Sequence, residues 1–177
     1  APMIVAGTPN YVKKVVFPLE TLGVSAVLAA LFNMAVGFGA WLVFWWFVKW
    51  TLPPATALLL PVLIVPVVLT TLGMAWLLAS LGVFLPDLYH AVTLVVQMLF
   101  FATPVIYRIE NLPDERIQFA MRLNPLALAL EDARGVMIEG LMPHWGWWAL
   151  STIASAVIAL VGYAFFMKSK KAFADVL

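Results

Sequence analysis

The ionisable side chains that could act as general acids or bases gather in one stretch of the sequence, positions 108–145. They include Glu110, Asp114, Glu115, Arg116, Glu131, Asp132, Arg134 and Glu139. Paired carboxylates can move protons to and from a substrate, so this cluster is the candidate for an enzyme site. A solvated pair of helices with local ion pairs, such as Glu131 with Arg134, accounts for the same pattern. We expect the second, with no catalytic residue in the chain.

The other reactive groups exclude several classes of site. His90 and His144 have no acidic residue at a metal-ligand spacing, and the chain has no cysteine, so we expect no metal site. No GxxxxGK sequence occurs, which excludes a P-loop that would bind ATP in this chain. The net charge of +1 gives no support to nucleic-acid binding.

The elements that must position this cluster are apolar helices. Hydrophobic residues make up 64% of the chain and charged residues 11%, whereas soluble domains carry about 25% charged residues. Four stretches without Asp, Glu, Lys or Arg are long enough for helices that cross a bilayer. We place the spans at 22–47, 56–83, 91–107 and 147–167. Their continuous apolar character argues against alternating barrel strands, so the sequence predicts an all-α membrane protein with four transmembrane helices.

Two short amphipathic helices are expected outside the hydrocarbon, between the third and fourth spans. Pro113 suits the first helical position, and two acids follow it in the first turn. Asn124 and Pro125 repeat this signal as N-cap and first position, and Gly140 can close the second helix.

The predicted spans contain no Asp, Glu, Lys, Arg or His. Proton-coupled transporters usually keep such groups at membrane depth, so a partner must supply the driving force. Asn33 and Gln97 either bond between helices or line a substrate path. Pro61 and Pro66 should bend the second span.

Tryptophans and lysines bear on orientation. Two tryptophan clusters, at the end of the first span and the start of the fourth, fit interfacial belts on one shared side. Basic residues divide five against five between the two sides. The dense C-terminal lysines favour cytoplasmic termini. The clusters are Trp41, Trp45, Trp46 and Trp50, and Trp145, Trp147 and Trp148.

Four blocks closely resemble the ABC-2-type permeases that export bacterial cell-surface polysaccharides. The most specific is TPNYVKKVVFPLE at 8–20, which is similar to a cytoplasmic loop of that family. FFATPVIY at 100–107 is similar to the end of the family's fifth span, and LNPL at 123–126 and KAFAD at 171–175 follow in the family's order. The resemblance covers essentially the whole chain.

The resemblance implies six spans in the whole protein, of which this chain would hold the last four. We therefore expect the chain to be a fragment, lacking an amphipathic N-terminal helix and two spans. It implies that a separate ABC ATPase subunit binds ATP and magnesium, leaving no cofactor in this chain. Two permease copies would form a homodimer around a channel in the bacterial inner membrane. The cargo would be a lipid-linked polysaccharide such as an O-antigen, capsular or teichoic-acid chain.

The resemblance also assigns roles to parts of the chain, which we take as a single partial transmembrane domain, 1–177. The ATPase would dock on the cytoplasmic segment 1–20, three spans would occupy 21–107, and external gate helices would lie in 108–146. The last span would be 147–167 and a cytoplasmic tail 168–177. The docking residues would be Pro9, Asn10, Tyr11, Lys13 and Lys14, and the gate residues Pro113, Arg122, Asn124, Pro125, Glu131 and Arg134.

Aromatic and amide side chains in or beside the spans are candidates to line the channel, because aromatic faces stack on sugar rings. These candidates are Phe44, Trp76, Gln97, Phe100, Phe101 and Tyr107. Besides a structural membrane subunit without transport, two active alternatives to polysaccharide export stay open at this point. One is an ABC-2 exporter of a drug or another lipophile. The other is a membrane-embedded enzyme acting on lipid-linked sugars, for which Asp114, Glu131 and Asp132 are the candidate acids.

Overall fold

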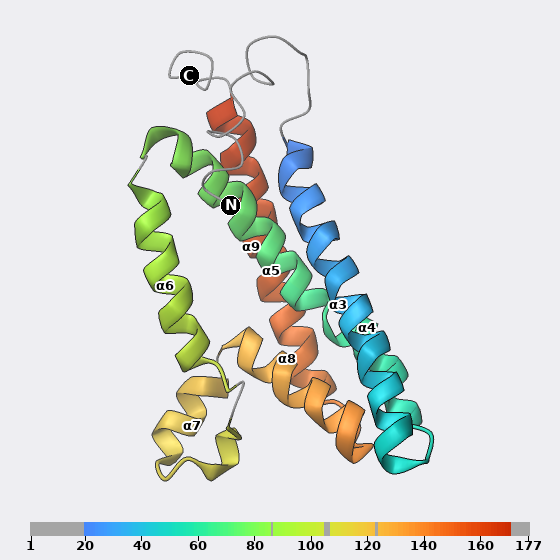
Figure 1. The fold of residues 1–177 in the computed structure, drawn as a ribbon. Coiled ribbons are helices and arrows are strands. Elements are labelled where there is room, and N and C mark those ends of the chain that lie inside the picture. Colours follow the sequence, from blue (N-terminus) through green and yellow to red (C-terminus); the bar gives the residue numbers. More distant parts are fainter. Residues whose placement is uncertain (1–19, 86, 105–106, 123, 171–177) are drawn as a thin grey trace. The chain divides into compact units, whose positions relative to one another are not determined.

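The computed structural model describes residues 20–85, 87–104, 107–122 and 124–170 (Figure 1). In these ranges every regular element is a helix and no strand occurs, which confirms the predicted all-α class. The elements are α3 (Glu20–Lys49), η1 (Ala55–Leu59), α4 (Leu60–Leu63), α5 (Val65–Phe84), α6 (Leu88–Ala102), η2 (Ile109–Asn111), α7 (Glu115–Arg122), α8 (Pro125–Arg134), η3 (Gly135–Glu139) and α9 (Trp145–Ser169).

Three helical stretches are long and apolar enough to cross a membrane, and a fourth apolar helix is shorter. The long ones are Glu20–Lys49, Ala55–Phe84 and Trp145–Ser169, and the shorter one is Leu88–Phe100. The predicted third span at 91–107 was wrong at its end, because α6 stops at Ala102. Pro104 has no N–H and disfavours helical geometry in the residue before it.

The second apolar stretch is interrupted at Ile64, between α4 and α5. Pro66 has no N–H, so the carbonyl of Val62, four residues earlier, loses its helical donor. The indole Nε1 of Trp148 donates a 3.0 Å hydrogen bond to that carbonyl oxygen. The bend expected from Pro61 and Pro66 thus takes the form of a break, and α9 supplies the missing donor.

The chain divides into two compact units. Unit 1 comprises Ala1–Ala30, Val68–Val96 and Ala154–Leu177, and unit 2 comprises Leu31–Val67 and Gln97–Ile153. Helices α3, α5, α6 and α9 contribute residues to both, so each unit contains segments of all four. Both tryptophan clusters belong to unit 2, as does the whole of the polar region between α6 and α9.

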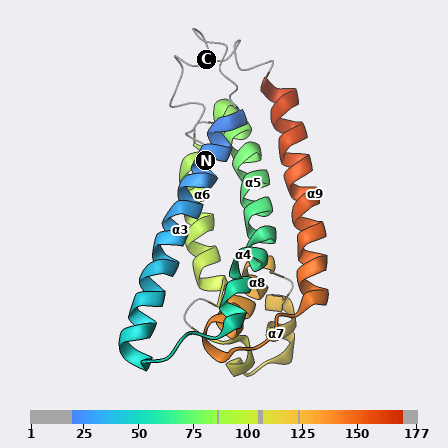
Figure 2. The ribbon, with the colours of Figure 1, turned by 90° about the vertical axis from the view of Figure 1, so that its right-hand side faces the viewer.

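Within unit 1, α5 and α9 lie side by side (Figure 2), and two glycines form their close contact. A Cβ atom on Gly73 would lie 2.6 Å from the carbonyl oxygen of Ile158, and a Cβ atom on Gly162 would collide with the backbone of Gly73. Beside this contact, the hydroxyl of Thr70 donates a 2.8 Å hydrogen bond to the buried hydroxyl of Ser155. Close backbone approach at small residues is a common way for apolar helices to pack in a membrane.

Within unit 2, α8 contacts α4 and α7, and the π-helical turn η3 contacts η1. Gly140 ends η3 with a left-handed φ of 70°. The hydroxyl of Thr56 in η1 donates a 2.7 Å hydrogen bond to the carbonyl of Val136, at a helix end where carbonyls lack helical donors. Gly140 therefore closes the second amphipathic helix as predicted, after the π-turn that follows α8.

Candidate functional site

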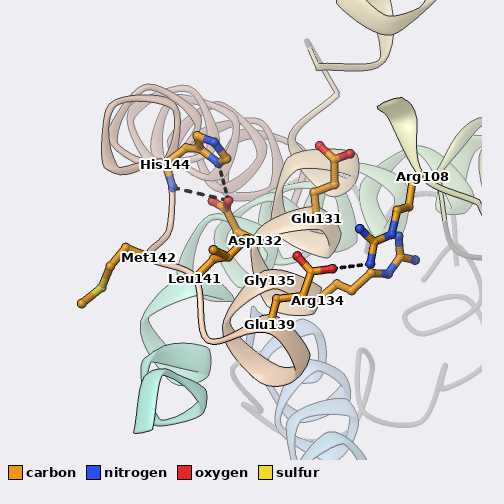
Figure 3. Close-up of a pocket in the computed structure, with 9 residues that line it drawn as sticks. All are labelled: Arg108, Glu131, Asp132, Arg134, Gly135, Glu139, Leu141, Met142 and His144. Atoms are coloured by element: carbon orange, nitrogen blue, oxygen red, sulfur yellow. Dashed lines mark hydrogen bonds and ion pairs between the residues drawn. The ribbon is translucent and has the colours of Figure 1, made fainter. Parts of the chain in front are cut away.

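A charged hollow of about 280 Å³ lies within unit 2. Its walls come from the segment after α6, from α8 and η3, and from the segment before α9 (Figure 3). The lining residues are Arg108, Glu131, Asp132, Arg134, Gly135, Glu139, Leu141, Met142 and His144. Six of these nine carry ionisable side chains, so we take the charged hollow as the candidate functional site.

Asp132 is the most buried of the hollow's charged side chains, with 7% of its surface exposed. Its Oδ1 lies 2.8 Å from Nδ1 of His144 and accepts a 3.4 Å hydrogen bond from the backbone N–H of the same histidine. Figure 3 shows both contacts. A buried carboxylate needs such partners. The pair therefore joins α8 to the segment that leads into α9.

Arg134 and Glu131 bind the backbone of the segment after α6. The Arg134 guanidinium donates two hydrogen bonds of 3.2 Å, from Nη1 to the carbonyl of Tyr107 and from Nη2 to the carbonyl of Pro104. Glu131 Oε1 accepts a 3.3 Å hydrogen bond from the N–H of Ile109, a residue with no exposed surface. The first two bonds join α8 to carbonyls between α6 and η2, and the third joins it to the first residue of η2, where backbone groups need such partners.

Arg108 and Glu139, which both line the charged hollow, form an ion pair (Figure 3). Their side chains are 45% and 31% exposed. Solvent screens a pair this open, so its contribution to stability is small. The two other acids of the hollow bind backbone groups or His144 instead.

Asp114 lies outside the charged hollow and caps a helix. Its Oδ1 accepts a 2.8 Å hydrogen bond from the N–H of Arg116, and α7 begins at Glu115. The prediction that Pro113 takes the first helical position was therefore wrong, because the Asp114 cap starts the helix two residues later. Of the acidic cluster considered for an enzyme site, the hollow brings together Glu131, Asp132 and Glu139. In the described part of the chain, no group of three or more His, Asp or Glu residues is placed to hold a metal ion.

The remaining gate candidates lie at the start of α8 and the end of α7. Asn124 is the N-cap of α8, and its Oδ1 accepts a 3.0 Å hydrogen bond from the N–H of Leu126, as predicted. Pro125 is the first residue of α8 and Arg122 the last of α7. Together with Glu131 and Arg134, these residues belong to unit 2. Their role in a gate stays a prediction.

The channel candidates divide between the two units. Trp76 belongs to unit 1, where its indole N–H donates a 3.0 Å hydrogen bond to the carbonyl of Glu20. Tyr107 lies beyond α6, and its hydroxyl donates a 3.6 Å hydrogen bond to Sδ of Met121. In unit 2, Phe44 is 66% and Phe100 51% exposed. Gln97 is also exposed there, and Phe101 follows Phe100 on α6. That these residues line a channel stays a prediction.

The predicted ATPase-docking residues Pro9, Asn10, Tyr11, Lys13 and Lys14 lie outside the described residues. Sequence reasoning missed the glycine contact of α5 and α9. A signal for it was present, because Ser155, Ala159 and Gly162 recur at helical spacing, as Thr70 and Gly73 do. It also missed the Asp132–His144 pair, for which we find no sequence signal.

Comparison with known proteins gives one family and several relatives. The family model described as ABC-2 type transporter matches residues 1–138. A protein of Klebsiella pneumoniae named O-antigen export system permease protein RfbA is 24% identical over 166 residues, covering 94% of this chain and 63% of the relative. A second RfbA of that species is 27% identical over 118 residues, covering 67% of this chain and 45% of the relative.

A Myxococcus xanthus protein of the same name is 27% identical over 164 residues. The match covers 92% of this chain and 62% of that relative. The chain thus spans between 45% and 63% of the length of these curated relatives.

Proposed function

Because this chain belongs to the ABC-2 type transporter family, we propose that it forms part of the membrane permease of an ATP-driven exporter. The observation that carries this proposal is the family match over residues 1–138. The proposed cargo is a lipid-linked cell-surface polysaccharide, since relatives aligned with 94% and 92% of the chain are named O-antigen export permeases. We place the permease in the bacterial inner membrane, as a multi-pass homodimer.

The proposed energy source is a separate ABC ATPase subunit that binds ATP and magnesium. The long apolar helices support this, because each carries at most two acidic or basic residues in its apolar window. A titrating group at membrane depth, which a proton-driven carrier needs, is absent from the sequence between Thr21 and Val48 and between Thr51 and Pro86. ATP hydrolysis in a partner is the simplest source that fits this composition.

The charged hollow has a structural role in this proposal. Glu131, Asp132 and Arg134 of α8 bind backbone groups of the segments that follow α6 and precede α9, and these bonds support a role in holding the external gate helix α8 in place. The enzyme alternative receives less support, because Asp114 caps α7 and Asp132 is engaged by His144. A neutral replacement of Asp114, Glu131 and Asp132 that abolished turnover of a lipid-linked sugar, with the fold intact, would favour that alternative.

The test is a double substitution in the ATPase-docking segment, Lys13→Glu with Lys14→Glu, in the permease as the cell makes it. Reversal of both charges should stop polysaccharide from reaching the cell surface, while the permease stays in the membrane and the ATPase continues to hydrolyse ATP. The matched control is Lys13→Arg with Lys14→Arg, which keeps both charges and should export normally. Normal export by the Glu variant would contradict the docking role. Neighbouring glycosyltransferase genes would favour polysaccharide over a drug or another lipophile as cargo.

A further inference from the structure

The buried residues of α3 are confined to its first turns. Of its 30 residues only Gly23 and Val27 are buried, and both belong to unit 1. Further along the helix, a Cβ atom added to Gly37 or Gly39 would meet nothing within 4 Å. The end of α3 nearest to the predicted ATPase-docking segment is therefore the end that is packed.

Glu20, the first residue of α3, contacts α5 and the residue that follows α9, both in unit 1. Its carboxylate Oε2 lies 2.7 Å from Nζ of Lys170, which directly follows α9. Its backbone carbonyl accepts the hydrogen bond from Trp76 on α5. The Lys170 and Glu20 side chains are 32% and 26% exposed, so solvent screens this pair less than a fully exposed one.

The Trp76 indole also lies close to other residues of α3 and α9. A Cβ atom on Gly23 would lie 3.3 Å from the indole, so this glycine lets α3 approach it closely. The ring of Tyr163 on α9 meets the indole edge to face, with 5.1 Å between ring centroids. One side chain of α5 thus contacts both α3 and α9. We call Glu20, Lys170 and Trp76 the Glu20 clasp.

We propose that the Glu20 clasp positions the start of α3 so that movement arriving through the docking segment passes to α5 and α9 together. This inference rests on the function proposed above. Lys14 precedes Glu20 by six positions in the sequence, so a displacement of the docking segment acts first on the first turn of α3. The Trp76 hydrogen bond carries it to α5, and the Lys170 ion pair carries it to α9.

Charge exchange tests the clasp in the complete permease–ATPase complex in proteoliposomes. Glu20→Lys alone and Lys170→Glu alone should each lower polysaccharide export about tenfold, because a part-buried charge is left beside a like charge. ATP hydrolysis per complex should stay close to that of the unchanged complex. The double variant, Glu20→Lys with Lys170→Glu, should restore export. Loss of export with continued hydrolysis separates positioning from general destabilisation, which would lower both with the amount of folded complex.

Lys168→Glu is the matched control, since Lys168 is a neighbouring lysine of α9 with an exposed side chain. Combined with Glu20→Lys, it should not restore export, although the net charge change is the same. Restoration by Lys168→Glu as well would overturn the clasp, because net charge at this end would then explain the result. Should Glu20→Lys fail to reach the membrane, Trp76→Phe keeps an aromatic side chain, although a smaller one, and removes the N–H donor, and should lower export about threefold.

The outcomes separate the clasp from the proposed function. If all the single variants export normally while Lys13→Glu with Lys14→Glu does not, the clasp is overturned and ATPase coupling stands. If the unchanged permease neither associates with an ATPase nor moves polysaccharide, the proposed function fails. If export is lost in the single variants and restored in Glu20→Lys with Lys170→Glu, the result supports both the clasp and the proposed function.

Discussion

Unit 1 joins α5 to α9 through glycine backbones, whereas unit 2 joins α8 to its neighbours through charged side chains. At Gly73 and Gly162 the helices touch with no side chain between them. In the charged hollow, Arg134 and Glu131 bind carbonyl and amide groups of the segment between α6 and α7. The difference follows the surroundings. Apolar helices gain little from hydrophobic contact in lipid and rely on close packing, while irregular backbone needs hydrogen-bond partners.

The glycine contact should show the largest effect of substitution, because backbone atoms cannot move aside as a side chain can. Gly162→Ala places a methyl group against the backbone of Gly73 and should lower the free energy of unfolding by about 3 kcal/mol. Thermal unfolding in one detergent measures this, and salt should not change the result. Gly37→Ala is the matched control, since its methyl group meets nothing within 4 Å. An equal loss for both would mean that helix approach is not what Gly162 provides.

Arg134 should give the next largest effect. Arg134→Met removes the donors to the carbonyls of Pro104 and Tyr107 and should lower the free energy of unfolding by about 2 kcal/mol. Arg134→Lys should recover part of this, because a single ammonium cannot reproduce the planar fork. The comparison variant is Arg116→Met, at an exposed arginine of α7. A stable Arg134→Met protein would show that the charged hollow does not hold the segment after α6.

These two sites also show what the sequence could and could not predict. Local signals succeeded where chemistry acts within a few residues, as with the Asn124 cap and the Gly140 end. The end of α6 was misplaced, because apolar character continues to Tyr107 while Pro104 ends the helix. Partners far apart in the sequence, such as Arg134 with Pro104, follow from tertiary packing that no local pattern encodes.

The break at Ile64 offers a smaller effect that links sequence to packing. Trp148→Phe removes the donor to the Val62 carbonyl and should lower the free energy of unfolding by about 1 kcal/mol. Pro66→Ala restores an N–H that can bond to this carbonyl within the helix. In the Pro66→Ala protein, Trp148→Phe should therefore lower the free energy of unfolding only slightly. A double-mutant cycle of unfolding free energies should show that the two substitutions are coupled. Independent, additive losses would mean that Trp148 does not compensate for the proline.

The ion pair of Arg108 and Glu139, drawn as a dashed line in Figure 3, should show the smallest effect. Both side chains are substantially exposed, so Glu139→Gln should lower the free energy of unfolding by about 0.5 kcal/mol or less. Raising the salt concentration should remove even this difference, because mobile ions screen exposed charges. Unfolding curves at low and high salt measure it. A loss of unfolding free energy as large as that of Arg134→Met would contradict this. It would mean that the Arg108–Glu139 ion pair stabilises unit 2 as much as the side chains that bind backbone groups.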